Sequence, residues 1–321
     1  MDEKIFNENL KERIYTLNKT IWENKINGQK ITNWLNNFET DEEKSIALYL
    51  LSEFMYFGDI QLKVLLKTLY RDLFRYPIIN QIRIDNAHTL DSNIIEPEYH
   101  KILYNTRFFS IGNPSASSAH LMYYFRQENN LPTCPLFDEN GIDYSKLKYV
   151  IFIDDFCGTG SQVTSDVELI TKINQIRATN SNIVISYFML VGTTHGIQNI
   201  ILSKLFDKVE AVIEIDDTFK CFSPDSRLFK GIDLPYDITT YKETVYKYGF
   251  PLIKSISLGL GHDDTKSDMI AHFNALGFGD CQLLLGFNHN TPDNTLPIIW
   301  YDEQHICWTP IFKRYNKKYT F

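Results

Sequence analysis

Two neighbouring aspartates, Asp154 and Asp155, follow an apolar run and precede a glycine turn in YVIFIDDFCGTGSQ, residues 149–162. Gly158 and Gly160 allow the backbone to approach a ligand closely and to adopt positive φ angles. A helix that starts directly after the turn adds free N–H groups and the positive end of its dipole. Together these features predict a phosphate-binding turn.

The aspartates add a property that a phosphate site does not need, because a carboxylate repels phosphate. Two carboxylates before the turn suit the hydroxyl groups of an attached sugar, or a Mg²⁺ ion that bridges sugar and diphosphate. Thr159 and Ser161 add hydroxyl donors to the turn. The segment matches neither GxxxxGK[ST] nor GxGxxG. A plain strand-to-helix turn with a solvated aspartate pair is the alternative interpretation.

Alternating strands and helices must position this turn. The predicted strands are 107–112, 149–154, 182–192 and 208–216, and the predicted helices between them are 117–127, 162–177 and 195–206. This alternation predicts an α/β fold with a parallel sheet and right-handed crossovers. In such sheets ligands bind beyond the carboxyl ends of the strands, where the aspartates and glycines fall.

The N-terminal part of the chain has a helical pattern. Thr40 and Glu43 have the spacing of a capping box, and Pro77 is expected to end a later leucine-rich helix. We expect no strong strand before residue 100. The expected division is a helical region over 1–80 and an α/β core with a C-terminal extension over 81–321. Since the helical region has no evident part in the chemistry, self-association or partner docking is its expected role.

Composition narrows the class of protein. Lys+Arg 32 against Asp+Glu 40 gives a net charge of −8, which argues against general nucleic-acid binding but leaves room for a local basic patch. The opening MDEKIFNENL is not a signal peptide, and no apolar run approaches the ~20 residues of a membrane span. Five scattered cysteines without a CxxC pair favour a reduced, cytoplasmic protein without zinc.

The segment around the aspartates resembles the signature of type I phosphoribosyltransferases. That signature is an apolar strand, two acidic residues, two apolar or small residues, a spacer and Thr-Gly-x-Thr. The matching residues are Val150 to Ile153, Asp154, Asp155, Phe156, Cys157, Gly158, Thr159, Gly160 and Ser161, with Gln162 in place of the final Thr. The resemblance implies a phosphoribosyltransferase-type core with Mg²⁺. In it, Asp154 and Asp155 contact the ribose of phosphoribosyl pyrophosphate (PRPP), and the turn holds the 5-phosphate.

Two further loops fit the same scheme. In FFSIGNPSASSAHLMYYF a strand, a small-residue loop and a helix follow one another, and the resemblance implies that this loop holds the pyrophosphate. Its candidate residues are Gly112, Asn113, Ser115, Ser117 and Ser118. A helix start capped by serine is the alternative. After the next strand, Thr193 and Thr194 are candidates for the pyrophosphate site, and His195 could act as a base, although lone loop histidines are usually solvated.

The C-terminal segment HNTPDNTLPIIW resembles the end of phosphoribosyltransferase-like proteins from bacterial conflict and phage-defence loci, over about residues 30–315. Asn290 and Asn294 could read a base or a sugar, or could hold a structural loop. The region 131–147 is short and not basic, unlike the closing loop of active family members. Two functions stay open: a PRPP-using enzyme, or a non-enzymatic nucleotide sensor that controls a partner through the N-terminal helices.

Overall fold

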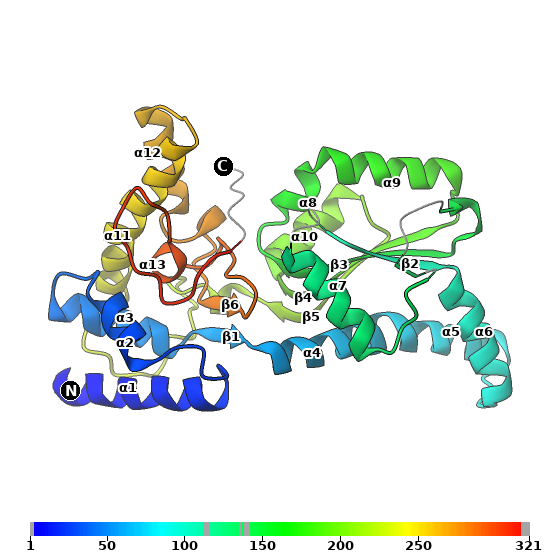
Figure 1. Cartoon of the computed structure of the whole chain (residues 1–321), viewed down its shortest axis with the longest axis horizontal. Helices are drawn as coiled ribbons and strands as arrows, with labels where there is room; N and C mark the ends of the chain where they lie inside the picture. Colours follow the sequence, from blue (N-terminus) through cyan, green and yellow to red (C-terminus); the bar gives the residue numbers. More distant parts are fainter. Residues whose placement is uncertain (1–2, 112–115, 135, 138–141, 316–321) are drawn as a thin grey trace. The chain divides into compact units, whose positions relative to one another are not determined.

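The computed structural model describes residues 3–111, 116–134, 136–137 and 142–315, with the backbone alone for 116–119. Figure 1 labels its helices and strands. They form two compact units, each described by itself below. Unit 1 comprises Met1–Ile60 and Asp216–Phe321, and unit 2 comprises Gln61–Ile215.

Unit 2 is built on a four-stranded parallel sheet in the order β2-β3-β4-β5. The strands are β2 Thr106–Ser110, β3 Tyr149–Cys157, β4 Val184–Thr193 and β5 Lys208–Ile215. The central strands read as near-continuous apolar runs because side chains pack on both of their faces. The predicted α/β fold with a parallel sheet is confirmed, and all four predicted strands are present.

The crossover helices of unit 2 are α7 Ala116–Glu128, α8 Ser161–Ser165, α9 Val167–Thr179 and α10 Thr194–Ser203, with a 3₁₀ turn, η2, at Tyr144–Lys146. One helix was expected over 162–177, but two are present. The reason is Asp166, whose carboxylate accepts the N–H of Leu169 at 3.0 Å and caps a new helix. The restart changes the helical phase, and Val167, the first residue of α9, is 73% exposed.

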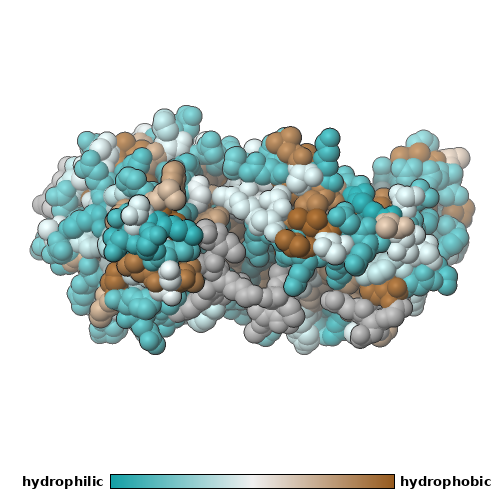
Figure 2. Space-filling view, turned by 90° about the horizontal axis from the view of Figure 1, so that it is seen from above, coloured by the Kyte–Doolittle hydropathy of each residue, from teal (hydrophilic) through white to brown (hydrophobic). Residues whose placement is uncertain are grey.

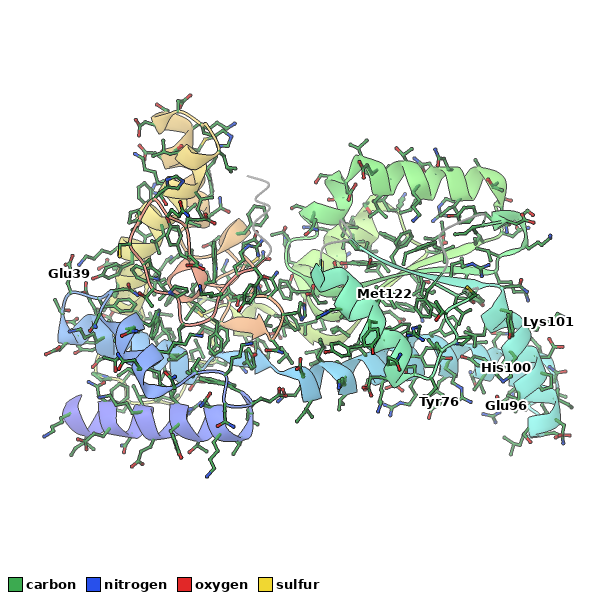
Figure 3. All side chains as sticks on the ribbon, viewed as in Figure 1. Glu39, Tyr76, Glu96, His100, Lys101 and Met122 are labelled. Atoms are coloured by element: carbon green, nitrogen blue, oxygen red, sulfur yellow. The ribbon has the colours of Figure 1, made fainter. Side chains whose placement is uncertain are left out.

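A long helical run opens unit 2. It comprises α4 Asp59–Thr68, the π-helical turn η1 Leu69–Arg75 and α5 Tyr76–Asp85, and α6 Ser92–Tyr104 follows it. The expectation that Pro77 ends a helix was wrong: Pro77 lies in the first turn of α5, and the helical run continues through it. The carbonyl of Leu73, four residues earlier, accepts the Lys208 ammonium at 3.3 Å. Helix α6 packs on this run through a hydroxyl–hydroxyl bond between Tyr70 and Tyr99. Figure 3 labels Glu96 on α6, which forms an ion pair with Arg75 at 3.3 Å.

Unit 1 combines the two ends of the chain. From the first end come α1 Glu3–Thr20, α2 Gly28–Leu35, α3 Asp41–Ser52 and β1 Met55–Phe57. From the second come η3 Asp217–Phe219, α11 Ile238–Gly259, α12 Asp264–Asn274, η4 Phe278–Asp280, β6 Leu285–Phe287 and α13 Pro297–Trp300. Strands β1 and β6 pair in parallel, with Tyr56 opposite Gly286. The expectation of no strand before residue 100 therefore misses β1, which is too short to show a period of two.

The first 60 residues complete a core together with the C-terminal residues. One apolar cluster contains Trp22, Trp34 and Tyr49 from the first segment and Tyr241 and Trp300 from the second. The indole of Trp34 donates to the carbonyl of Ile298 at 2.8 Å, and the hydroxyl of Tyr49 donates to the carbonyl of Leu228. The expected division at residue 80 differs from this arrangement: residues 61–80 belong to the sheet unit, and residues 216–321 do not extend it.

Local capping and the surface complete the description. The capping box predicted at Thr40 and Glu43 is present and starts α3. The face drawn in Figure 2 is largely hydrophilic, with apolar patches set apart from one another. Within the described ranges, each helix is either too short or too polar to cross a bilayer.

Candidate functional site

The expected phosphate turn follows the carboxyl end of β3, one of the two central strands of unit 2. Cys157, buried, and Phe156, half-buried, end that strand, and Gly158 to Gly160 lead into α8. Gly160 has a φ of 77°, which disfavours any other residue, and a Cβ there would lie 2.8 Å from the carbonyl oxygen of Gly196. The turn therefore needs glycine for its conformation and for its contact with α10.

Thr193, at the end of β4, and Asn199, on helix α10, fix the turn by bonding two of its carbonyls. The hydroxyl of Thr193 donates to the carbonyl of Gly158, and the amide of Asn199 donates to the carbonyl of Thr159 at 3.0 Å. The contact is tight, because a Cβ on Gly196 would lie 2.1 Å from the Gly158 oxygen. The turn is thus held rigidly from one side.

The opposite side of the turn presents backbone N–H groups. In a trans peptide the N–H points away from the preceding carbonyl, so the N–H groups of Thr159 and Gly160 point away from α10. Neither forms a hydrogen bond to a residue in the described part of the chain. The hydroxyls of Thr159 and Ser161 bond each other at 2.8 Å, and Gln162 is exposed in the first turn of α8. This arrangement of donors suits a phosphate.

The two aspartates lie near the end of β3, before this loop. The carboxylate of Asp154 accepts the N–H of Asp155 at 2.9 Å and the hydroxyl of Tyr187 at 2.8 Å. Burial raises the pKa of Asp154 well above its usual range, and the neighbouring Asp155 carboxylate adds to the rise. Burial likewise raises the pKa of Tyr187. Asp154 therefore acts as an acceptor that fixes the backbone presenting Asp155.

The donor set does not form a metal cage. Both carboxylate oxygens of Asp154 already accept hydrogen bonds, and the described residues contain no group of three or more His, Cys, Asp or Glu that could hold a metal. Mg²⁺ prefers to keep several waters and to bind carboxylates together with substrate phosphates. The residues present therefore fit Mg²⁺ as an ion that arrives on a diphosphate ligand.

The other predicted pyrophosphate residues are placed unevenly. Gly112, Asn113 and Ser115 lie outside the described residues, and Ser117 and Ser118 lie at the start of α7. Thr193 lies against the turn, as above, and also accepts the N–H of Gly196 at 2.9 Å. The hydroxyl of Thr194 donates to the carbonyl of Ile215 at 3.4 Å. The Thr193 hydroxyl thus supports the turn, whereas the Thr194 hydroxyl bonds the end of β5.

The C-terminal candidates lie in unit 1, whereas the aspartates lie in unit 2. The amide of Asn294 donates to the carbonyl of Phe278 at 3.0 Å, and the side-chain oxygen of Asn290 accepts the N–H of Tyr315 at 2.9 Å. These bonds fold the HNTPDNTLP segment onto its own unit. A role for Asn290 and Asn294 in reading a base stays a prediction.

Three residues near the turn had no assigned role, or an uncertain one, from sequence. Tyr187, which bonds Asp154, is a polar aromatic residue inside an apolar strand, and that contrast is its sequence signal. Asn199 follows His195 by four residues on α10, which is the spacing of one helical face. The amide of Asn199 contacts the Nε2 of His195 at 3.0 Å, so His195 stands beside the turn.

A family model described as PRTase-CE matches residues 31–314, nearly the whole chain. The chain belongs to the PRTase-CE family. This match supports a phosphoribosyltransferase-like family, so the resemblance found in the sequence is confirmed at that level. Among curated proteins, none matches this PRTase-CE chain. Among solved structures it is similar to the AQ2163 protein from Aquifex aeolicus, at 11% identity over 60% of this chain and 86% of that one, with a TM-score of 0.28.

Proposed function

We propose that this PRTase-CE protein binds PRPP, or a related ribose phosphate, beyond the carboxyl end of β3. The observation that carries the proposal is the turn at 158–160. Its carbonyls are bonded by Thr193 and Asn199, and its N–H groups at Thr159 and Gly160 point away from α10. A 5-phosphate suits these donors. The hydroxyls of an attached ribose suit Asp155, which the Asp154 carboxylate orients through its backbone N–H.

The proposed reaction is transfer or hydrolysis of the ribosyl phosphate. The bond between ribose C1 and the pyrophosphate oxygen breaks, and pyrophosphate leaves with the electron pair. An acceptor or water forms the new bond at C1 and gives up a proton to the departing pyrophosphate. When bound with the diphosphate, Mg²⁺ supplies charge neutralisation on the leaving group. The protein contributes by positioning: the turn holds the phosphate, and Asp155 holds the ribose hydroxyls.

Titration calorimetry with PRPP and Mg²⁺, together with an assay of pyrophosphate release, tests the proposal. We expect Asp155→Asn to weaken binding at least tenfold, or about 1.4 kcal/mol. Asp85→Asn is the matched control, because Asp85 is an exposed aspartate at the end of α5 in the same unit. Equal affinity of the wild type and Asp155→Asn would refute the proposed ribose site.

A second candidate function is a non-enzymatic nucleotide sensor that uses the same turn and aspartates to control a partner. The observation that favours it is the composition of 131–147, in which Lys146 is the only basic residue where a closing loop is expected. A sensor would bind PRPP or a nucleotide with no release of pyrophosphate. Release of one pyrophosphate for each PRPP consumed would exclude this candidate.

The proposed biological role is that of an effector in bacterial anti-phage defence, acting in the cytoplasm. Its support is the likeness of the C-terminal segment to proteins of conflict and defence loci, noted above. The test compares plaque formation by a broad panel of phages on cells that express the wild type, cells that express the Asp155→Asn variant and cells that express neither. Equal plaque numbers on all of these cells, for every phage of the panel, would contradict this role.

A further inference from the structure

Strand β5 is the outer strand of the unit 2 sheet, and one of its edges has no strand beside it within the described residues. It pairs with β4 alone, from Ser186 opposite Lys208 to Thr193 opposite Ile215. Every residue from Lys208 to Ile213 is partly exposed, and Glu214 is exposed. Parallel sheets normally bury their strands, and an open edge offers a template for another strand.

The backbone groups at this edge can be assigned by alternation. The N–H of Asp207 donates to the carbonyl of Ile185 on β4 at 2.8 Å. Because N–H and C=O of one residue point to the same side and alternate along a strand, odd-numbered residues face β4. The backbone groups of Lys208, Glu210, Val212 and Glu214 therefore face the open edge.

A cavity of about 360 Å³ runs along β5. Asp72, Leu73 and Pro77 line it from the η1–α5 run, and Ile197 lines it from α10. The strand lines it with Lys208, Val209, Glu210, Ala211 and Glu214. The recess follows the strand edge between two helical elements, which is the space that an added strand occupies.

The sequence of β5, KVEAVIEI, is complementary to itself when two copies run antiparallel with Ala211 at the centre. Lys208 then lies opposite Glu214 of the second copy, and Val209 opposite its Ile213. Residues of even number meet residues of even number, so their outward N–H and C=O groups face each other as hydrogen-bonded pairs. A centre at Glu210 or at Val212 would instead set glutamates opposite glutamates.

The charges on the strand agree with this register. Glu214 has no ion pair within the described residues, although it is exposed on a strand that carries Lys208. Lys208 contacts Glu210 at 2.9 Å and the carbonyl of Leu73 at 3.3 Å, which holds its ammonium at the edge. The second copy would supply the missing cation for Glu214, and a two-fold axis makes the pair twice.

We propose that β5 pairs with β5 of a second copy of this chain across a two-fold axis, so that the two unit 2 sheets become continuous. The pairing adds about eight backbone hydrogen bonds, two for each of the outward-facing residue pairs. It removes the open edges of both copies, which is the usual protection against uncontrolled strand pairing. Lys208 and Glu214 set the register and make the contact selective for the chain itself.

Sedimentation equilibrium of charge variants tests the proposal. The wild type is expected to be a dimer. Lys208→Glu and Glu214→Lys, each alone, set like charges opposite one another twice and should weaken dimerisation at least tenfold. The double variant Lys208→Glu/Glu214→Lys restores opposite charges and should return the dissociation constant to within about threefold of the wild type. Lys101→Glu is the matched control, since Lys101 is an exposed lysine on α6 (Figure 3).

Circular dichroism establishes whether each variant is folded. If one single variant does not fold, the other still tests the same charge pair. As a second readout, amide exchange at Val212 should slow as protein concentration rises, because its N–H faces the open edge. The proposal is overturned if the wild type is still monomeric when its concentration is raised 100-fold in the sedimentation experiment. It is also overturned if the monomer binds an extended peptide at this edge instead of a second copy. A dimer that the double variant fails to restore overturns it as well.

Discussion

Replacing Asp154 by asparagine should change how the stability of unit 2 depends on pH. Burial and the Asp155 carboxylate raise the pKa of Asp154 in the folded protein, whereas an unfolded aspartate titrates near about 3.9. Between these two pKa values the folded state holds a proton that the unfolded state has released. The free energy of unfolding therefore falls by up to about 1.4 kcal/mol per pH unit as the pH rises through that window.

The amide introduced by Asp154→Asn does not titrate, so the variant loses this slope. The amide also keeps the bonding pattern of the protonated carboxyl: its oxygen accepts the N–H of Asp155, and its NH₂ group donates to the hydroxyl oxygen of Tyr187. At pH 4 the two proteins should therefore be similar in stability. As the pH rises through the window the wild type loses stability and the variant does not, so the variant should become the more stable protein.

The assay is urea denaturation of the wild type and Asp154→Asn between pH 4 and pH 7.5. All four tryptophans lie in unit 1, so their fluorescence reports that unit, and circular dichroism must follow unit 2. Tryptophan fluorescence then provides an internal control that should not distinguish the two proteins. A stability difference that stays constant over the whole pH range would refute the assignment of a raised pKa to Asp154.

The remaining predictions concern the turn, the ion pairs of unit 1 and the two units. Gly160→Val should abolish ribose 5-phosphate binding in titration calorimetry, because its Cβ meets the Gly196 carbonyl; Gly28→Ala, which has open space, should bind normally. Burial alone would raise the pKa of Glu43, but hydrogen bonds from Lys247 and the Thr40 backbone outweigh it and lower that pKa to about 2. Its stabilisation is present above pH 4.5 and is lost as the pH falls through 2, so by thermal unfolding Glu43→Gln should lose on the order of 2 kcal/mol at pH 7 and only a small fraction of that at pH 2. A fragment of residues 61–215 should still bind ribose 5-phosphate, whereas deletion of residues 1–60 should leave unit 1 unfolded by tryptophan fluorescence.

The site and the division into units differ in how far sequence could predict them. Strand β3 and its turn were visible because the apolar run, the aspartates and the glycines are consecutive in the sequence. The bond from Tyr187 to Asp154 depends on the register of β4 against β3, which sets residues 33 positions apart in contact. No local pattern contains that register.

The boundaries of the units could not be predicted for the same reason. Strand β1 is three residues long and is stabilised by β6, which lies more than two hundred residues further on. The apolar run before it reads as one helix until that partner is known. The prediction at Pro77 was wrong because the sequence shows a residue that disfavours helix interiors, but not whether it stands at the end of one helix or in the first turn of the next.

The discontinuous core of unit 1 has a consequence for synthesis on the ribosome. The indole of Trp34 bonds a carbonyl 264 residues later, at Ile298. At about 5–20 residues per second, roughly 15–50 s separate the emergence of these two residues. The sheet of unit 2 can form during that interval, while the first three helices have only one another to pack against. Nascent chains should therefore depend on a holding chaperone until the last strand and α13 have been translated.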